Sequence, residues 1–169
     1  MGTLVEQLAT TRIGDTFNQY AHAPHLCVRL ARYLQAREGA EVLLVGEAAG
    51  YRGARVSGLP FTSERQLTGA GPAEATATIV HRILRELDVE DTVLLWNVVP
   101  THPGTATTNR RPTRAEVAAA LPFARELARG RRVLAVGRFA EEALGAPYVR
   151  HPSHGGSAAF RATLSSCLT

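Results

Sequence analysis

Three short, continuous apolar runs rich in Val and Leu are the clearest hydrophobic pattern in this chain. They read EVLLVG at 41–46, TVLLWNVV at 92–99 and RRVLAVG at 131–137, and a weaker fourth run, PYVRH, occupies 147–151. Continuous runs of this length are typical of strands that are buried on both faces of a parallel sheet. The pattern therefore predicts four parallel strands.

Segments with apolar residues at helical spacing alternate with these runs. Thr113 and Glu116 form a capping box at the start of one such segment, and Gly130 follows its end near Arg129. The alternation predicts a single domain over residues 1–169, folded as a three-layer α/β/α sandwich with a four-stranded parallel sheet. The predicted helices occupy 18–36, 73–87, 113–129, 138–144 and 157–168.

The stretch VGEAAGYRGARVSGLPF, residues 45–61, has the glycine content of a phosphate-binding loop but not its spacing. Its glycines follow G-x-x-x-G-x-x-G rather than G-x-G-x-x-G, and no helical pattern begins before Arg65, which argues against a nicotinamide or flavin site. A P-loop is excluded because the chain contains no Lys. The stretch instead holds a carboxylate, Glu47, near its start and an aromatic ring, Phe61, at its end.

Polar side chains occur where the predicted strands end. Glu47 follows the first strand, Asn97 lies toward the end of the second, and His151 follows the fourth. Each has a structural alternative, because all three side chains could be satisfied by local hydrogen bonds and Phe61 could simply plug the core. Ligands bind beyond the carboxyl ends of strands in open parallel sheets. The convergence of an acid, an amide and an imidazole therefore predicts a binding site at this edge.

Composition and charge limit the partners and the location. The chain has 169 residues, 45% of them hydrophobic, and a formal net charge of +4 in which every basic residue other than His is Arg. The missing Lys fits a codon bias, whereas the positive balance favours an anionic partner. No apolar run approaches the roughly 20 residues that span a bilayer, and the N-terminus does not resemble a secretion signal. We therefore expect no membrane partner and a cytoplasmic location.

Metal and disulfide chemistry have little support in the sequence. Cys27 and Cys167 lack any motif spacing, and we expect both to be buried small apolar residues rather than a disulfide, ligands or nucleophiles. His151 and His154 are three residues apart and His102 could join them, but no Cys or acid lies at a spacing that would complete a site. We therefore predict no metal and no cofactor.

Five short motifs in order resemble the uracil-DNA glycosylase superfamily, most closely its family 4 type: GEAAG at 46–50, GLPF at 58–61, WNVVP at 96–100, NRRPT at 109–113 and HPS at 151–153. The resemblance implies the sandwich fold and the removal of uracil from DNA by metal-independent hydrolysis. It implies that Glu47 positions water and favours the cationic sugar, and that Phe61 stacks on the flipped base. It also implies that Asn97 reads the uracil edge and that His151 hydrogen-bonds the base carbonyl as negative charge develops there.

The other expected contacts come from the motif-one loop, from the arginine pair of NRRPT and from the glycine-rich loop after HPS. That last loop precedes a predicted helix, whose free N–H groups favour phosphate. The arginine pair could alternatively be solvated surface charge. The further pocket residues expected are Gly46, Ala48 and Tyr51, and the DNA contacts expected are Arg110, Arg111, Ser153, His154, Gly155, Gly156 and Ser157.

The chain also departs from the family 4 pattern. Two distant cysteines cannot hold the iron–sulfur cluster of those members, so we predict none. Ala49 replaces a motif proline, and glycines at 155–156 stand where many relatives carry an apolar wedge, which favours single-stranded DNA. Gly50 lies where another family has a tyrosine that excludes the thymine methyl group. The alternatives are a glycosylase for hypoxanthine, xanthine or mismatched thymine, and a DNA-binding relative with little activity; we expect a monomer.

Overall fold

Four parallel strands form one sheet at the centre of the molecule. The computed structural model describes residues 2–169. The strands are β1 (Val42–Ala48), β2 (Val93–Val99), β3 (Arg132–Val136) and β4 (Tyr148–Val149). They lie in the order β2-β1-β3-β4, so β1 pairs with β2 on one side and with β3 on the other. The four predicted strands and their parallel arrangement are confirmed.

Both faces of the sheet are apolar, which is why helices cover both. In β1, Leu43 and Val45 belong to one core cluster, whereas Val42 and Leu44 belong to the other. This alternation follows from the two-residue period of a strand, and it explains why the runs do not alternate apolar and polar residues in the sequence.

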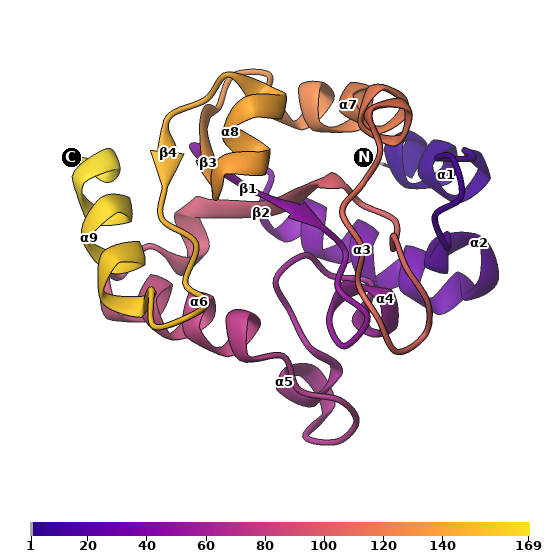
Figure 1. Ribbon diagram of the computed structural model, residues 1–169, viewed down its shortest axis with the longest axis horizontal. Coiled ribbons are helices and arrows are strands. Elements are labelled where there is room, and N and C mark those ends of the chain that lie inside the picture. Colours follow the sequence, from indigo (N-terminus) through magenta and orange to yellow (C-terminus); the bar gives the residue numbers. More distant parts are fainter. Residues whose placement is uncertain (1) are drawn as a thin grey trace.

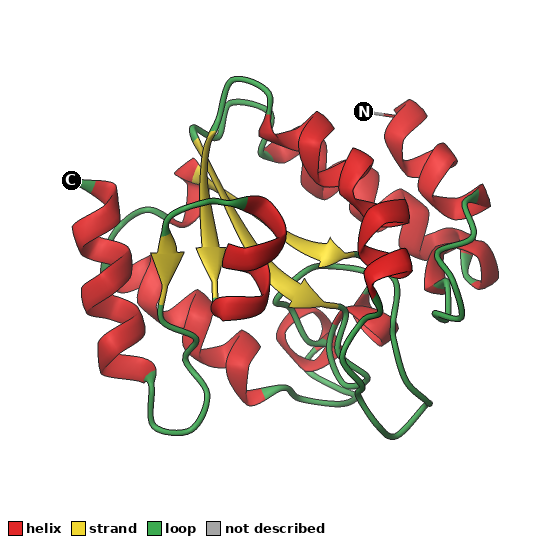
Figure 2. Cartoon of the chain, turned by 45° about the horizontal axis from the view of Figure 1, so that its top comes forward, coloured by secondary structure: helices red, strands yellow, loops and turns green. Residues whose placement is uncertain are grey.

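The helices form the two outer layers of the predicted sandwich. Helices α1, α3, α7 and α8 pack on one face of the sheet, and α6 and α9 pack on the other (Figures 1 and 2). Their bounds are α1 (Gly2–Thr10), α2 (Gln19–His22), α3 (Pro24–Ala36), α4 (Ala54–Ser57), α5 (Glu64–Thr68), α6 (Ala75–Glu86), α7 (Arg114–Ala128), α8 (Arg138–Leu144) and α9 (Ser157–Leu168), with a 3₁₀ turn at Glu90–Thr92. The first and last helices lie toward opposite ends of the molecule (Figure 1).

The predicted helix over 18–36 is in fact two helices. The Asn18 side chain caps α2 by accepting hydrogen bonds from the N–H groups of Tyr20 and Ala21. Ala23 is extended, with φ −136° and ψ 90°, and Pro24 then begins α3. A residue before proline is pushed out of the helical region, which explains the break.

Three other helices differ from the sequence-based expectation. Helix α1 was not predicted, although it contributes Leu4, Val5 and Leu8 to the core. The segment up to Arg65 was predicted to be irregular, but α4 and the start of α5 lie within it. Both are short, with four and five residues, so their sequences contain too few turns to show a period.

No helix among the described residues is long and apolar enough to cross a membrane.

Candidate active site

The four side chains singled out at the strand ends line a single cavity of about 360 Å³. Glu47 comes from the end of β1, Asn97 from β2, His151 from just beyond β4, and Phe61 from the turn after α4. The cavity therefore sits at the carboxyl edge of the sheet, where an open parallel sheet binds ligands. A cleft of this size falls in the range of small-ligand sites.

Asn97 presents an unpaired carboxamide to this cavity. The register of β1 and β2 places it opposite Gly46, and the residue is 4% exposed. None of the side-chain hydrogen bonds within residues 2–169 involves it, so the structural alternative of an Asn bonded to backbone does not apply. A buried amide normally finds partners, and here its free donor and acceptor face the cavity.

Phe61 forms one wall of the cavity, and Gly46 makes room for its ring. The backbone of Phe61 is in the left-handed region, with φ 50°, which is uncommon for a residue with a side chain. A Cβ atom at position 46 would lie 2.3 Å from Phe61 Cζ and 3.2 Å from Asn97 Oδ1. Gly46 thus lies behind the ring and the amide, and any side chain there would displace one of them.

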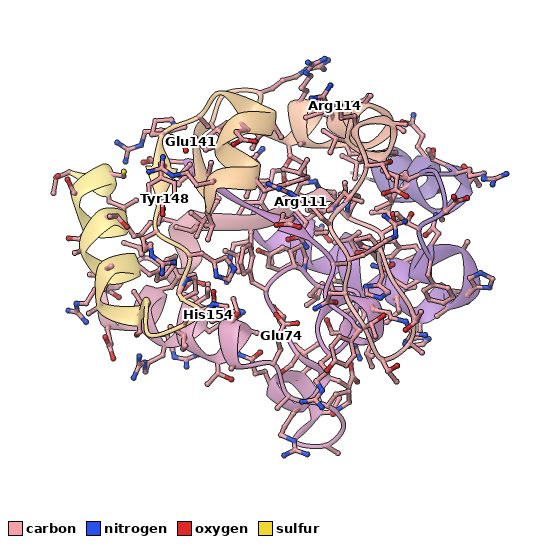
Figure 3. The ribbon with its side chains drawn as sticks, viewed as in Figure 1. Glu74, Arg111, Arg114, Glu141, Tyr148 and His154 are labelled. Atoms are coloured by element: carbon pink, nitrogen blue, oxygen red, sulfur yellow. The ribbon has the colours of Figure 1, made fainter. Side chains whose placement is uncertain are left out.

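Glu47 carries the carboxylate nearest to the end of β1. Burial raises the pKa of Glu47, and the positive charge of Arg111 lowers it. Arg111 lies on the segment that leads into α7 (Figure 3). Its guanidinium lies 5.1 Å from the centre of the Phe139 ring. This arginine was expected to contact phosphate, and the structure also makes it a counter-charge for the candidate catalytic carboxylate.

His151 has a defined tautomer because one ring nitrogen is occupied. The backbone N–H of Ser153 donates to Nδ1 over 3.1 Å, and the Ser153 hydroxyl lies 2.8 Å from the same nitrogen. Since a backbone N–H can only donate, Nδ1 is an acceptor and the neutral ring carries its proton on Nε2. Burial lowers the pKa of His151, as do Arg150 and His154. These effects favour the neutral ring, which has one N–H left to donate.

The loop 153–157 turns tightly behind His151. His154 and Gly155 both have positive φ, 53° and 73°. A Cβ atom at position 156 would lie 2.4 Å from the His151 carbonyl oxygen, so only Gly156 fits there. Ser157 then begins α9, and its hydroxyl accepts a hydrogen bond from Arg82. Phosphate binding by this loop stays a prediction.

The NRRPT segment is fixed to the rest of the molecule by two side chains. The Arg110 guanidinium forms a bidentate ion pair with the buried carboxylate of Glu116, at 2.6 and 2.8 Å. Asn109 accepts a hydrogen bond from the backbone N–H of Tyr51. Arg110 is thus exposed but already paired, whereas Asn109, which was not predicted, connects this segment to the motif-one loop.

His102 links the loop that precedes the NRRPT segment to the motif-one loop. Its Nδ1 lies 2.7 Å from the Ala49 carbonyl oxygen, and its Nε2 lies 2.7 Å from that of Thr105. Both ring nitrogens are therefore used by backbone, and His102 does not join His151 and His154 in a metal site. Among the described residues, no group of three or more potential ligands could hold a metal ion. Cys27 and Cys167 are free and only partly buried.

The remaining predicted pocket residues also reach the cavity. Ala48 and Tyr51 line it, and Gly46 supports its wall. Sequence reasoning missed Glu74, a second carboxylate in the lining. An acid just before a helix is a common N-cap, so its sequence position carried no signal that its side chain would lie in a cavity.

Comparisons with known proteins bear on the family and the fold of the chain. A family model described as "Uracil DNA glycosylase superfamily" matches residues 34–164. Among solved structures, the crystal structure of wild-type SMUG2 from Pedobacter heparinus is similar with a TM-score of 0.70 and 13% sequence identity, over 99% of this chain and 96% of that one. No curated protein matched the chain. At this identity the structural likeness supports the fold, and the family match rests on the sequence itself.

Proposed function

This chain belongs to the uracil DNA glycosylase superfamily, and we propose that it is a monofunctional glycosylase that hydrolyses the bond between uracil and deoxyribose in DNA. The superfamily identifies it as a DNA glycosylase; the base and the hydrolytic mechanism are our proposal. The observation that carries the proposal is the cavity in which a free amide, a neutral imidazole, a carboxylate and a ring face one another.

The cavity walls suit a uracil that has rotated out of the base stack, as glycosylases require. Uracil has a flat face and an imide edge, on which an N–H donor lies between two carbonyl acceptors. The Phe61 ring offers a flat apolar surface for the face. The Asn97 carboxamide offers one acceptor and two donor hydrogens, which matches the N–H and one neighbouring carbonyl of that edge.

His151 and Glu47 suit the two charges that develop as the bond breaks. Negative charge accumulates on the departing base, and the free Nε2–H of His151 can donate to its carbonyl oxygen. Positive charge accumulates on the sugar, where the Glu47 carboxylate stabilises it and accepts a proton from the attacking water. Fixed groups in a site shielded from water are effective at both tasks.

The surroundings of the cavity suit a single strand of DNA. Arg52 lies over the Tyr51 ring, 5.3 Å from its centre, at the rim of the cavity. Aromatic rings and arginines together bind single-stranded nucleic acid by stacking and by phosphate contact. We propose that this rim and the loop 153–157 hold the strand on either side of the flipped base.

The test uses oligonucleotides that contain one uracil, as single strands and as duplexes, with alkaline cleavage to reveal abasic sites. We expect cleavage with the wild-type protein and a loss of about 10²-fold for Asn97→Asp, which keeps the shape of the side chain but removes its donor. His25→Ala, an exposed substitution on α3, serves as the control. DNA binding without cleavage in any substrate would instead indicate a binding protein.

A further inference from the structure

Three polar side chains outside the cavity, those of Thr62, His81 and Glu90, are linked in series beside the turn that carries Phe61. The Thr62 hydroxyl lies 3.0 Å from His81 Nε2, and His81 Nδ1 lies 2.9 Å from Glu90 Oε1. His81 belongs to α6, and Glu90 begins the 3₁₀ turn that follows this helix. None of the three is among the residues that line the cavity, so the function proposed above gives them no role.

A hydroxyl, an imidazole and a carboxylate in this order could form a nucleophile with its base. The surroundings of the hydroxyl argue against that role. Thr62 is 5% exposed, and its hydroxyl donates a hydrogen bond to the Pro60 carbonyl oxygen over 3.0 Å. A nucleophile must reach its substrate, whereas this hydroxyl is buried behind the residue that forms the cavity wall. The series of side chains is therefore better explained by what it holds in place.

The residue that it holds is Phe61, whose backbone is strained. Phe61 has a φ of 50°, and such a conformation persists only where the surrounding contacts enforce it. The hydrogen bond from the Thr62 hydroxyl to Pro60 spans Phe61 directly, and the Ser57 hydroxyl donates to the Thr62 carbonyl oxygen over 2.6 Å. Loss of the Thr62 hydroxyl would therefore release one of the bonds that fix this turn.

The same side chains connect the turn to α6. The Phe61 ring belongs to the core cluster that contains Val80, the residue before His81. At the other end of the series, Glu90 Oε1 also lies 3.6 Å from Nη1 of Arg85, which is on α6 as well. A network of satisfied, partly buried polar groups makes its surroundings rigid. Apolar packing and this polar network thus act together on the ring.

We propose that Thr62 and His81 are positioning residues, which hold the Phe61 ring in the place where it stacks on the flipped base. The inference rests on the proposed function, because that function assigns the stacking to Phe61. A ring that is already in place when the base enters needs no ordering on binding. A small misplacement of such a group slows a reaction even when the substitution lies away from the reacting atoms.

The experiment measures single-turnover release of uracil from a single-stranded oligonucleotide. Thr62→Val keeps the shape of the side chain and removes its hydroxyl. We expect release to be about 10-fold slower, within what a small misplacement of a binding group produces. Thr62→Ser keeps the hydroxyl and should restore release to near the wild-type rate. Thr10→Val, an exposed substitution at the end of α1, is the matched control and should leave the rate unchanged.

A double-mutant cycle with Phe61→Leu separates positioning of the ring from a general loss of structure. Phe61→Leu has no ring to position, so the addition of Thr62→Val should leave its slower rate nearly unchanged. A general loss of structure would instead slow release by the same factor with and without the ring, because independent effects are additive in free energy. His81→Gln should behave as Thr62→Val does, and it replaces Thr62→Val in the cycle if that variant does not fold.

The outcomes distinguish this inference from the proposed function. Equal slowing by Thr62→Val with and without the ring would overturn the inference and leave the proposed function intact, as would a wild-type rate for Thr62→Val. A wild-type rate for Phe61→Leu would overturn the inference together with the stacking role of the ring. No release of uracil by the wild-type protein would overturn the proposed function and the inference together.

Discussion

Asn97 and His151 both keep hydrogen-bonding groups free at the cavity. The Asn97 amide is almost fully buried without a partner among residues 2–169, and Ser153 occupies His151 Nδ1 so that only Nε2 remains. Both side chains line the cavity, where a ligand could reach them. Their presence together in one cavity indicates that they are kept for a ligand, and it explains why they stood out as polar residues among apolar runs.

Arg111 should control the pH at which Glu47 becomes active. Its charge lowers the pKa of Glu47, against the rise that burial causes. In Arg111→Gln we therefore expect a higher pKa for Glu47. The carboxylate must be ionised to act. As the pH is lowered, uracil release by Arg111→Gln should therefore decline at a higher pH than uracil release by the wild-type protein.

The pH–rate profile of uracil release by both proteins measures this shift. Arg32→Ala, an exposed arginine on α3, is the matched control and should keep the wild-type profile. Identical acid limbs for Arg111→Gln and the wild-type protein would show that Arg111 does not act on Glu47.

Within strand β1, Gly46 determines the shape of the cavity wall. A Cβ atom there would meet the Phe61 ring at 2.3 Å. Gly46→Ala should therefore displace the ring, slow uracil release and destabilise the fold by about 1–3 kcal/mol through overpacking. Thermal unfolding and the rate of uracil release test this prediction. Gly39→Ala is the control, because a Cβ atom at position 39 would meet no other atom within 4 Å. A wild-type melting temperature and a wild-type release rate for Gly46→Ala would contradict the prediction.

Glu116 holds the beginning of α7 and the NRRPT segment together. It accepts hydrogen bonds from Arg110 and from the backbone N–H groups of Thr113 and Asp15. The Arg110 guanidinium is the main cause that lowers the pKa of Glu116 from 4.5 to about 2. A carboxyl group whose pKa is lower in the folded state stabilises the fold above its unfolded pKa, and that contribution is lost as pH falls.

We expect Glu116→Gln to lower the free energy of unfolding at pH 7 by about 2 kcal/mol, because hydrogen bonds to a charged group are replaced. The wild-type protein should also lose stability between pH 4.5 and about 2, and the variant should lose less in that window. Denaturant titrations at several pH values measure both effects. Parallel pH curves for the two proteins would mean that Glu116 titrates normally.

The sequence predicted elements whose signal is local and missed those that depend on tertiary packing. The strands were visible as apolar runs, and the capping box of Thr113 is present as predicted. Glu47, Asn97 and His151 could be found because parallel strands end at one edge of a sheet. The position of the Glu74 side chain in the cavity depends on its contacts with Gly50 and Gly53, and no local sequence pattern predicts such contacts.

The whole molecule carries a positive net charge, which favours binding to an anionic polymer such as DNA. Its formal net charge is +4, and binding to DNA should weaken as salt is raised because counterions are released from each neutralised phosphate. The logarithm of the affinity should fall linearly with the logarithm of the salt concentration. Arg52→Ala should make that slope shallower by about one, the value for a single lost phosphate contact.

Fluorescence anisotropy with a labelled single strand measures these slopes, and Arg32→Ala is again the control. A slope that is the same for Arg52→Ala and the wild-type protein would remove Arg52 from the DNA-binding rim. A preference for duplex over single strands would contradict the role that we propose for this rim.

Detection of the free base is the most direct measurement of the enzyme's chemistry. The wild-type protein is incubated with a single strand that contains one uracil, and the small molecules released are identified by mass spectrometry. We predict free uracil together with an unbroken strand that carries one abasic site, and release that is about 10²-fold slower for His151→Ala. No free uracil from the wild-type protein, or equal release by both proteins, would contradict the assignment of this cavity as a uracil-excising site.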